Sequence, residues 1–147
     1  MGTITVSQSA PVEASAETAY RLIADDAHRV QFLPDAISGF RTLEGGVGTG
    51  TVHGFTLAAG KRQRPYVLRV TETEPGHVLT ETDQGSSLVT TWTVTPTAGT
   101  CTVEITTTWT GAGGIGGFFE RTFAPKALAG IYAQQLERLD RHARTQA

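Results

Sequence analysis

The sequence predicts an α+β protein in which a curved, antiparallel sheet of seven strands wraps around one long C-terminal helix. Apolar residues follow helical spacing in the last part of the chain, whereas residues 37–110 mostly alternate with a period of two. Short turn sequences separate the alternating runs, which makes neighbouring strands antiparallel. At 147 residues, with 39% hydrophobic residues, the chain is expected to form a single domain over residues 1–147.

The first third of the chain predicts one strand and two short helices. Residues 3–9 alternate as a strand, which we expect Ala10-Pro11 to close. Ser15 is placed as the N-cap of a helix. Asp25-Asp26 can end that helix and start a second, short one, which stops at Pro34.

The middle of the chain predicts six further strands. They cover residues 37–43, 52–57, 64–73, 78–83, 88–95 and 101–110. The glycine-rich run at 45–50 lacks the Gly-Lys-Ser/Thr ending of a phosphate-binding loop and precedes a strand rather than a helix. We therefore expect a flexible hairpin loop in which glycines take positive φ.

The C-terminal run from about residue 115 to 146 predicts the long helix. Its apolar stripe consists of Leu128, Ile131, Tyr132, Leu136 and Leu139. Phe119 and Phe123 form a second pair on a different face, and Pro125 lies between the two, so we expect a kink or a break in the helix there. The five glycines within residues 111–117 either hinge a lid over a cavity or simply connect the last strand to the helix.

Composition argues against several classes of partner. A net charge of −2 and a pI near 6.1 give no electrostatic reason to expect nucleic acid. No apolar stretch has membrane-spanning length, so we expect no integral membrane association. The single Cys101 cannot form an intramolecular disulfide, and no signal peptide is apparent, so a cytoplasmic location is expected. The oligomeric state stays open.

Several local motifs resemble one superfamily along nearly the whole chain. They are Ala10-Pro11-Val12-Glu13, the helix at 16–25, Phe32-Leu33-Pro34, the glycine-rich loop at 45–50, residues 69–76, and Thr91 to Pro96 before Gly99-Thr100. This pattern resembles the START-like helix-grip superfamily (SRPBCC), which includes START lipid-transfer domains, the birch-pollen allergen family and bacterial polyketide cyclase/dehydrase proteins. The polyketide cyclase/dehydrase branch is the most similar.

The resemblance implies a helix-grip fold, in which sheet and helix enclose an apolar cavity for a lipid, sterol, polyketide or other hydrophobic small molecule. Some members of the superfamily cyclise or dehydrate their ligand, and many only carry it. A shared fold does not transfer a reaction. We expect neither a cofactor nor a metal.

Strand parity predicts which side chains face the helix, because successive side chains point to opposite faces of a sheet. A one-residue shift in register would reverse every assignment on a strand. The predicted inward residues are Leu88, Thr90, Trp92 and Val94, then Val103, Ile105, Thr107 and Trp109, then Tyr66, Leu68 and Val70, then His53, Phe55 and Leu57, and finally Leu79, Glu81 and Asp83.

Four residues are candidates for acid–base chemistry. Three belong to the inward set, Glu81, His53 and Tyr66, and the fourth is Arg64, two residues before Tyr66. A carboxyl group on an apolar wall has a raised pKa, which suits Glu81 to proton transfer near neutral pH. The unperturbed pKa of histidine lies near neutrality, so His53 could act as a proton shuttle, and Tyr66 and Arg64 can orient a ligand oxygen. Alternatively, Glu81 and Asp83 are solvated and pair with Arg62, Arg64 or Arg69, and His53 is structural.

A further set of residues is predicted to contact the ligand. It comprises Phe55, Leu68, Asp83, Thr90, Trp92, Thr107, Trp109, Phe119, Phe123 and Tyr132. Aromatic side chains supply large apolar area with defined geometry. The alternative for each is ordinary core packing.

Three functions therefore stay open. The first is binding of a hydrophobic small molecule, with possible turnover as a cofactor-independent polyketide cyclase, aromatase or dehydratase acting by acid–base catalysis. The second is a non-catalytic carrier or sensor for a lipid, quinone or sterol-like molecule. The third is an accessory interaction module with a vestigial pocket.

Overall fold

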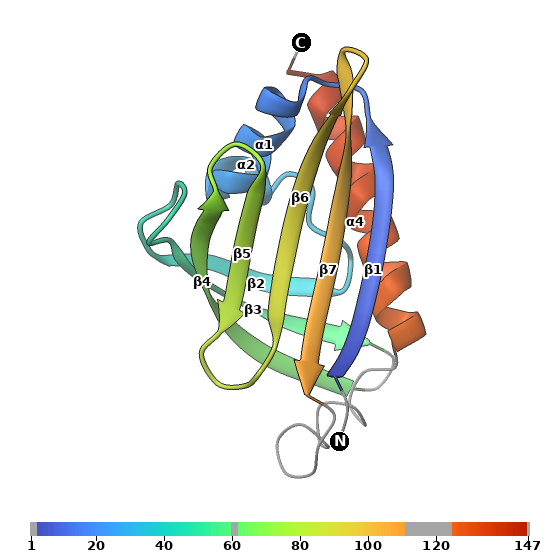
Figure 1. Ribbon diagram of the computed structural model, residues 1–147. Helices are drawn as coiled ribbons and strands as arrows, with labels where there is room; N and C mark the ends of the chain where they lie inside the picture. Colours follow the sequence, from blue (N-terminus) through green and yellow to red (C-terminus); the bar gives the residue numbers. More distant parts are fainter. Residues whose placement is uncertain (1–2, 60–61, 111–124, 147) are drawn as a thin grey trace.

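The chain forms one antiparallel sheet of seven strands that curls around the C-terminal helix (Figure 1), as the sequence predicted. The computed structural model describes residues 3–59, 62–110 and 125–146. The strands are β1 (Thr3–Val12), β2 (Ile37–Glu44), β3 (Val52–Ala59), β4 (Arg62–Glu74), β5 (Val78–Asp83), β6 (Val89–Thr97) and β7 (Thr100–Thr110). The helices are α1 (Ala16–Ala24), α2 (Asp26–Arg29) and α4 (Pro125–Arg144). The strand order is β1-β7-β6-β5-β4-β3-β2.

Strand β1 is longer than predicted. It continues through Pro11 to Val12, so the expectation that Ala10-Pro11 closes the strand is wrong. β1 is an edge strand that pairs only with β7. An edge strand tolerates proline because the missing N–H group can lie on the side without a neighbouring strand.

Helix α4 begins at Pro125, where proline suits the first turn because its missing N–H has no partner within a helix. The predicted inward residues Leu128, Leu136 and Leu139 are buried. Phe119, Phe123, the expected kink and the glycines at 111–117 fall outside the described residues. Among the described helices, none combines the length and apolar character needed to cross a bilayer.

The predicted strand faces are confirmed, since every residue predicted to point inward is less than 10% exposed. The buried residues form two clusters. One lies under α1 and α2 and includes Trp92, Val103 and Leu139. The other lies toward the start of α4 and includes Phe55, Trp109 and Leu128. In Figure 1, β2 and β3 cross behind the strands from β5 to β7, and side chains of both strands pack in this second cluster.

The glycine-rich loop between β2 and β3 takes positive φ as predicted, for example +68° at Gly45 and at Gly48. It is, however, held at several points. The Gly48 N–H donates to the Ala24 carbonyl at 3.0 Å, and the Gly46 carbonyl accepts from the Asp26 N–H at 2.8 Å. The loop therefore fixes the start of α2 rather than acting as a free hairpin.

Candidate functional site

The space between the sheet and α4 contains two small compartments, each with a volume of about 40 Å³. The apolar compartment is lined by Ile37, Phe55, Leu57, Tyr66, Leu68, Leu88, Thr90, Leu128, Ile131 and Tyr132. The polar compartment is lined by Arg29, Leu33, Ile37, Phe40, Phe55, Leu68, Glu81, Thr90, Trp92, Tyr132 and Gln135. Five residues line both compartments and so separate them: Ile37, Phe55, Leu68, Thr90 and Tyr132.

Each compartment is small compared with a drug-sized pocket, which occupies roughly 300–1,000 Å³. Binding of a larger molecule therefore requires the side chains between the compartments to move.

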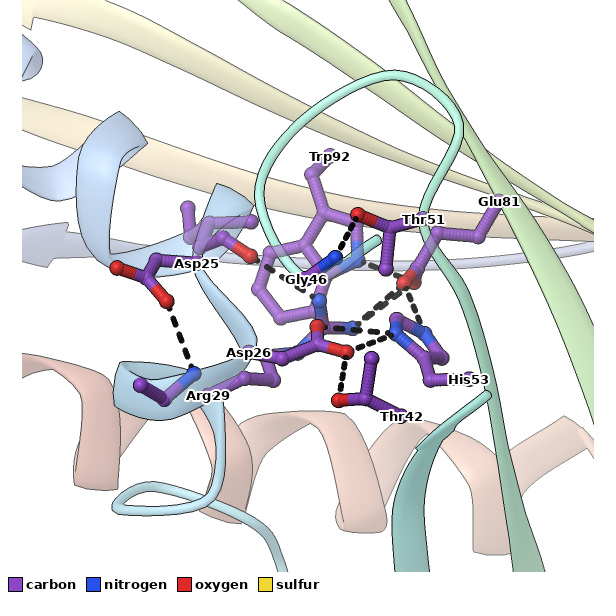
Figure 2. A network of polar contacts seen from close by, with 11 residues as sticks. Asp25, Asp26, Arg29, Thr42, Gly46, Thr51, His53, Glu81 and Trp92 are labelled. Atoms are coloured by element: carbon purple, nitrogen blue, oxygen red, sulfur yellow. Dashed lines mark hydrogen bonds and ion pairs between the residues drawn. The ribbon is translucent and has the colours of Figure 1, made fainter. Parts of the chain in front are cut away.

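A cluster of buried charged groups forms one wall of the polar compartment (Figure 2). Its centre is Glu81 on β5, which is 1% exposed. The Arg29 Nη2 atom donates to both Glu81 oxygens, at 2.9 and 3.0 Å, and the Trp92 indole N–H donates to Oε1 at 2.9 Å. The Arg29 guanidinium also lies over the Trp92 ring, 4.5 Å from its centroid. Arg29 thus joins α2 to the inner face of β5 and β6.

His53 lies between two carboxyl groups and is completely buried. Its Nδ1 atom is 3.0 Å from Asp26 Oδ1, and its Nε2 atom makes an ion-pair contact of 2.9 Å with Glu81 Oε2 that falls outside hydrogen-bond geometry. The Thr42 hydroxyl donates to Asp26 Oδ2 at 2.7 Å. Two carboxyl groups thus face one guanidinium and one imidazole, so the cluster balances in charge when His53 is protonated.

The pKa of His53 follows from these neighbours. Burial favours the neutral imidazole, but the hydrogen bond to Asp26 and the contact with Glu81 outweigh it and raise the pKa of His53 above its ordinary value. A raised pKa favours the imidazolium at neutral pH, which is the form that both carboxyl groups stabilise.

The expected raised pKa of Glu81 is wrong. Burial alone would raise it, but the Arg29 charge, with the neighbouring His53, brings the pKa of Glu81 well below its ordinary value. Nor does Glu81 pair with Arg62, Arg64 or Arg69, since its partner comes from α2. An ionised, fully hydrogen-bonded carboxylate is a poor proton donor at neutral pH.

Tyr66 and Arg64 form a separate group with Asp83. Arg64 Nη2 lies 3.9 Å from Asp83 Oδ2, as one of the sequence-based alternatives proposed, and its guanidinium carbon is 5.4 Å from the Tyr66 ring centroid. Asp83 also accepts from the Ser86 hydroxyl at 2.6 Å. Burial raises the pKa of the Tyr66 phenol. The four candidates for acid–base chemistry therefore form two separate groups: His53 lies beside Glu81, and Arg64 lies beside Tyr66.

A chain of hydroxyl groups connects the sheet to α4 at the boundary between the compartments. The Thr90 and Thr107 hydroxyls lie 2.8 Å apart, and Thr107 also hydrogen-bonds the Tyr132 hydroxyl. Burial raises the pKa of Tyr132. Thr90 and Tyr132 line both compartments, whereas Thr107 lies behind them.

The other predicted contact residues divide between cavity wall and core. Phe55 and Leu68 line both compartments, and Trp92 lines the polar one. Trp109 is buried in the second core cluster, beside the apolar compartment. Asp83 accepts hydrogen bonds from Ser86 in the β5–β6 turn and from the Val67 N–H on β4, and it lines neither compartment.

Sequence reasoning missed Asp26, Arg29 and Gln135, which are all buried. One signal for the first two was available. Asp26 and Arg29 are three residues apart, a spacing that puts opposite charges on one face of a helix. Two inward charged side chains on the sheet, His53 and Glu81, required partners of that kind. In the described part of the chain, no three His, Cys, Asp or Glu side chains are grouped to hold a metal ion.

Comparison with known proteins agrees with this architecture. Over residues 3–144 the sequence matches the family described as polyketide cyclase/dehydrase and lipid transport. The solution structure of the KanY protein is 37% identical, with 98% of this chain and 99% of KanY covered and a TM-score of 0.87. No curated protein matches the sequence.

Two more distant structures share the fold. A point mutant of norcoclaurine synthase from Thalictrum flavum, solved with a transition-state analogue, is 16% identical, with 99% of this chain and 96% of that chain covered and a TM-score of 0.76. TTHA0849 from Thermus thermophilus is 17% identical, with 98% of this chain and 99% of that chain covered and a TM-score of 0.78.

Proposed function

The chain belongs to the polyketide cyclase/dehydrase and lipid transport family, and we propose that it binds a hydrophobic small molecule between the sheet and α4. The observation that carries this proposal is the apolar compartment, whose wall is almost entirely hydrocarbon and aromatic. It adjoins a polar compartment with a few fixed polar groups. An apolar pocket with convergent polar groups is the usual form of a small-molecule site.

The ligand would occupy both compartments once they are joined. Tyr132 and Phe55 stand between the two spaces, so a rotation of these side chains would connect them. Each apolar Å² that the ligand removes from water contributes about 25 cal/mol, which favours a ligand with an extended hydrocarbon or aromatic surface. The polar wall then orients one end of it.

A substitution that fills the apolar compartment tests this proposal. Ile131 lines the compartment from α4 and is half-buried, so Ile131→Trp can place its ring in that space. We expect at least ten-fold weaker binding of a naphthalene-based fluorescent probe. Ala133→Trp puts the same side chain on the exposed face of α4 and should leave binding unchanged. Equal binding by both variants would contradict the proposal.

Native mass spectrometry of freshly purified protein gives the identity of the occupant. A bound hydrophobic molecule should add its mass to the wild-type protein and be lost in the Ile131→Trp variant. Retention of the same adduct by that variant would place the molecule outside the cavity.

A second candidate function is turnover of a polyketide-like ligand as a cyclase, aromatase or dehydratase, because Glu81 and Tyr132 both line the polar compartment. Glu81 would act as an ionised group that stabilises positive charge, His53 would position it, and Tyr132 would donate a hydrogen bond to a ligand oxygen. Tyr66, with Arg64 beside it, would orient the ligand at the apolar end.

Tyr132→Phe separates turnover from binding, since it removes the hydroxyl and keeps the ring. An enzyme should lose at least ten-fold in kcat and still bind ligand. Glu81→Gln and His53→Ala should likewise abolish turnover in protein that remains folded. If all three variants retained full turnover, this assignment of roles would be wrong. A carrier would bind several apolar ligands without converting any of them.

A further inference from the structure

Gln135 is a polar residue in the middle of the inward face of α4. It lies between Tyr132 and Leu139 on that face, at a position where helical periodicity calls for an apolar side chain. Its side chain is 3% exposed and lines the polar compartment beside Arg29 and Glu81. It makes no side-chain hydrogen bond to any residue that the structure describes. An amide that lines a compartment without a protein partner can hydrogen-bond a molecule that enters it.

Other polar groups of the same compartment also retain hydrogen-bonding capacity. The Nη atoms of Arg29 bind Glu81 and the Ile23 carbonyl, but its buried Nε atom has no partner among the described residues. The Tyr132 hydroxyl, which hydrogen-bonds Thr107 and Thr90, lines the same compartment.

These groups define the chemistry that the compartment accepts. The unused groups are mostly donors, which calls for an oxygen acceptor. The Arg29 charge is already balanced by Glu81, so the wall offers no unpaired cation to a carboxylate or a phosphate. A neutral carbonyl or hydroxyl oxygen therefore fits better than an anion.

We propose that Gln135 selects the ligand, by hydrogen-bonding the carbonyl or hydroxyl group at the buried end of a neutral hydrophobic molecule. This inference rests on the proposed function and deepens it. The hydrocarbon part of the ligand lies in the apolar compartment, and its oxygen reaches the Gln135 amide past Tyr132. Gln135 is thus a specificity-determining residue, and the ligand class is a neutral aromatic or aliphatic ketone, phenol or alcohol.

A matched pair of probes tests the proposal: 2-acetylnaphthalene, which carries a carbonyl, and 2-ethylnaphthalene, which has nearly the same shape without it. We expect the wild-type protein to bind the ketone more tightly than the hydrocarbon once each affinity is corrected for the free energy of moving that probe out of water. This transfer is less favourable for the ketone. Gln135→Leu keeps the side-chain volume and removes the amide. We expect it to reduce the ratio of ketone to hydrocarbon affinity about five-fold, the size expected for one neutral hydrogen bond.

Gln134→Leu is the control, since it makes the same change one residue away. Gln134 hydrogen-bonds Asp35 at the surface, so its substitution should lower stability and leave the affinity ratio unchanged. Gln135→Leu, in contrast, should leave the free protein as stable as the wild type or make it more stable, because it removes an unpaired buried amide. If Gln135 had a structural role, Gln135→Leu would instead lower the free energy of unfolding.

The possible outcomes separate this inference from the proposed function. If Gln135→Leu weakens both probes equally, or changes neither, the amide serves only a buried water or the fold, and the inference is overturned. If the hydrocarbon still binds and Ile131→Trp still blocks it, the proposed function survives that result. If neither probe binds the wild-type protein, both proposals fail.

Discussion

Glu81 accepts hydrogen bonds from side chains of α2 and β6 while the His53 imidazole lies against its other oxygen. Burial has the largest single effect on the pKa of Glu81 and raises it, but the charges and hydrogen bonds of Arg29 and His53 together outweigh burial and lower the pKa. Glu81 and His53 are each held in the charged form by their neighbours, so the cluster is vulnerable to the loss of one member.

Glu81→Gln should lower the free energy of unfolding by about 3–5 kcal/mol, because it leaves the Arg29 guanidinium buried without an opposite charge. Urea denaturation at pH 7 measures this loss. Glu104→Gln is the control, since Glu104 is exposed on β7 and should change stability by less than about 0.5 kcal/mol. A loss below about 1 kcal/mol for Glu81→Gln would show that the cluster contributes little.

His53 should remain protonated above pH 6.5, the ordinary pKa of histidine, because its folded pKa is raised. Its contribution to stability is then complete below pH 6.5 and is lost as the pH rises through the folded pKa. NMR titration of the imidazole nitrogens measures this directly. His142 is the internal control, since burial and the neighbouring His28 lower its pKa and make it titrate below 6.5. The opposite order of the two titrations would refute the proposed charge balance.

At the scale of elements, the loop between β2 and β3 and the short helix α2 hold each other. The loop accepts the first N–H of α2, and Asp25 and Val47 form an isolated bridge. Glu72 on β4 accepts a hydrogen bond from the Thr49 N–H of this loop at 3.1 Å and another from the Tyr20 hydroxyl of α1 at 2.8 Å, so it links the loop to both elements. Because Asp26 and Arg29 both lie on α2, the loop also positions two members of the charged cluster.

Gly48→Ala should be more destabilising than a positive-φ glycine substitution normally is. Gly48 has φ +68°, and an added Cβ would lie 2.4 Å from Glu72 Oε1. Gly76→Ala is the control, because Gly76 has φ +85° and open space around it. That substitution should lower the free energy of unfolding only by the cost of a left-handed backbone, about 1–2 kcal/mol. In thermal and urea unfolding, Gly48→Ala should lower the free energy of unfolding by at least about 1 kcal/mol more than Gly76→Ala does. Equal losses would mean that the loop yields easily.

At the scale of the whole molecule, the core is divided between a cluster under α1 and α2 and a second cluster around the apolar compartment. Trp92 and Leu139 pack under α1 and α2, in a cluster whose buried members do not line the apolar compartment. Leu128 and Phe55 pack around that compartment at the other end. A molecule organised in this way can admit a ligand at one end while the other keeps the fold intact.

Ligand binding should therefore stabilise the whole domain. At a concentration of 100 times its Kd, a bound hydrophobic probe adds about 2.7 kcal/mol to the free energy of unfolding. A rise in Tm that saturates with probe concentration measures it, and Ile131→Trp should abolish the rise. An unchanged Tm at saturating probe would contradict binding to the native state.

Much of the fold could be predicted because its signals are local. Alternation along β6 and β7 placed Trp92 and Thr107 inward, and both are buried. Turn chemistry separated the strands, and a helical stripe identified α4. The end of β1 was missed because the tolerance for Pro11 depends on its being in an edge strand, and strand order is a property of the complete sheet.

The site was predictable only in part. The inward direction of Glu81 and His53 follows from strand parity, which their own neighbours in sequence reveal. The partners do not follow, because Arg29 and Asp26 lie 52 and 27 residues away in the sequence. Gln135 was overlooked because its significance lies in an unfilled hydrogen-bonding capacity, which appears only when the surrounding walls are known.

The sequence by itself thus determined the elements, their faces and the family resemblance, since hydrophobic periodicity and turn residues act over a few positions. Only the tertiary structure decided the protonation of Glu81, the size of the compartments and the position of Gln135 beside them. The physical reason is that charge, volume and hydrogen bonding in a buried site depend on groups that folding brings together from distant parts of the chain.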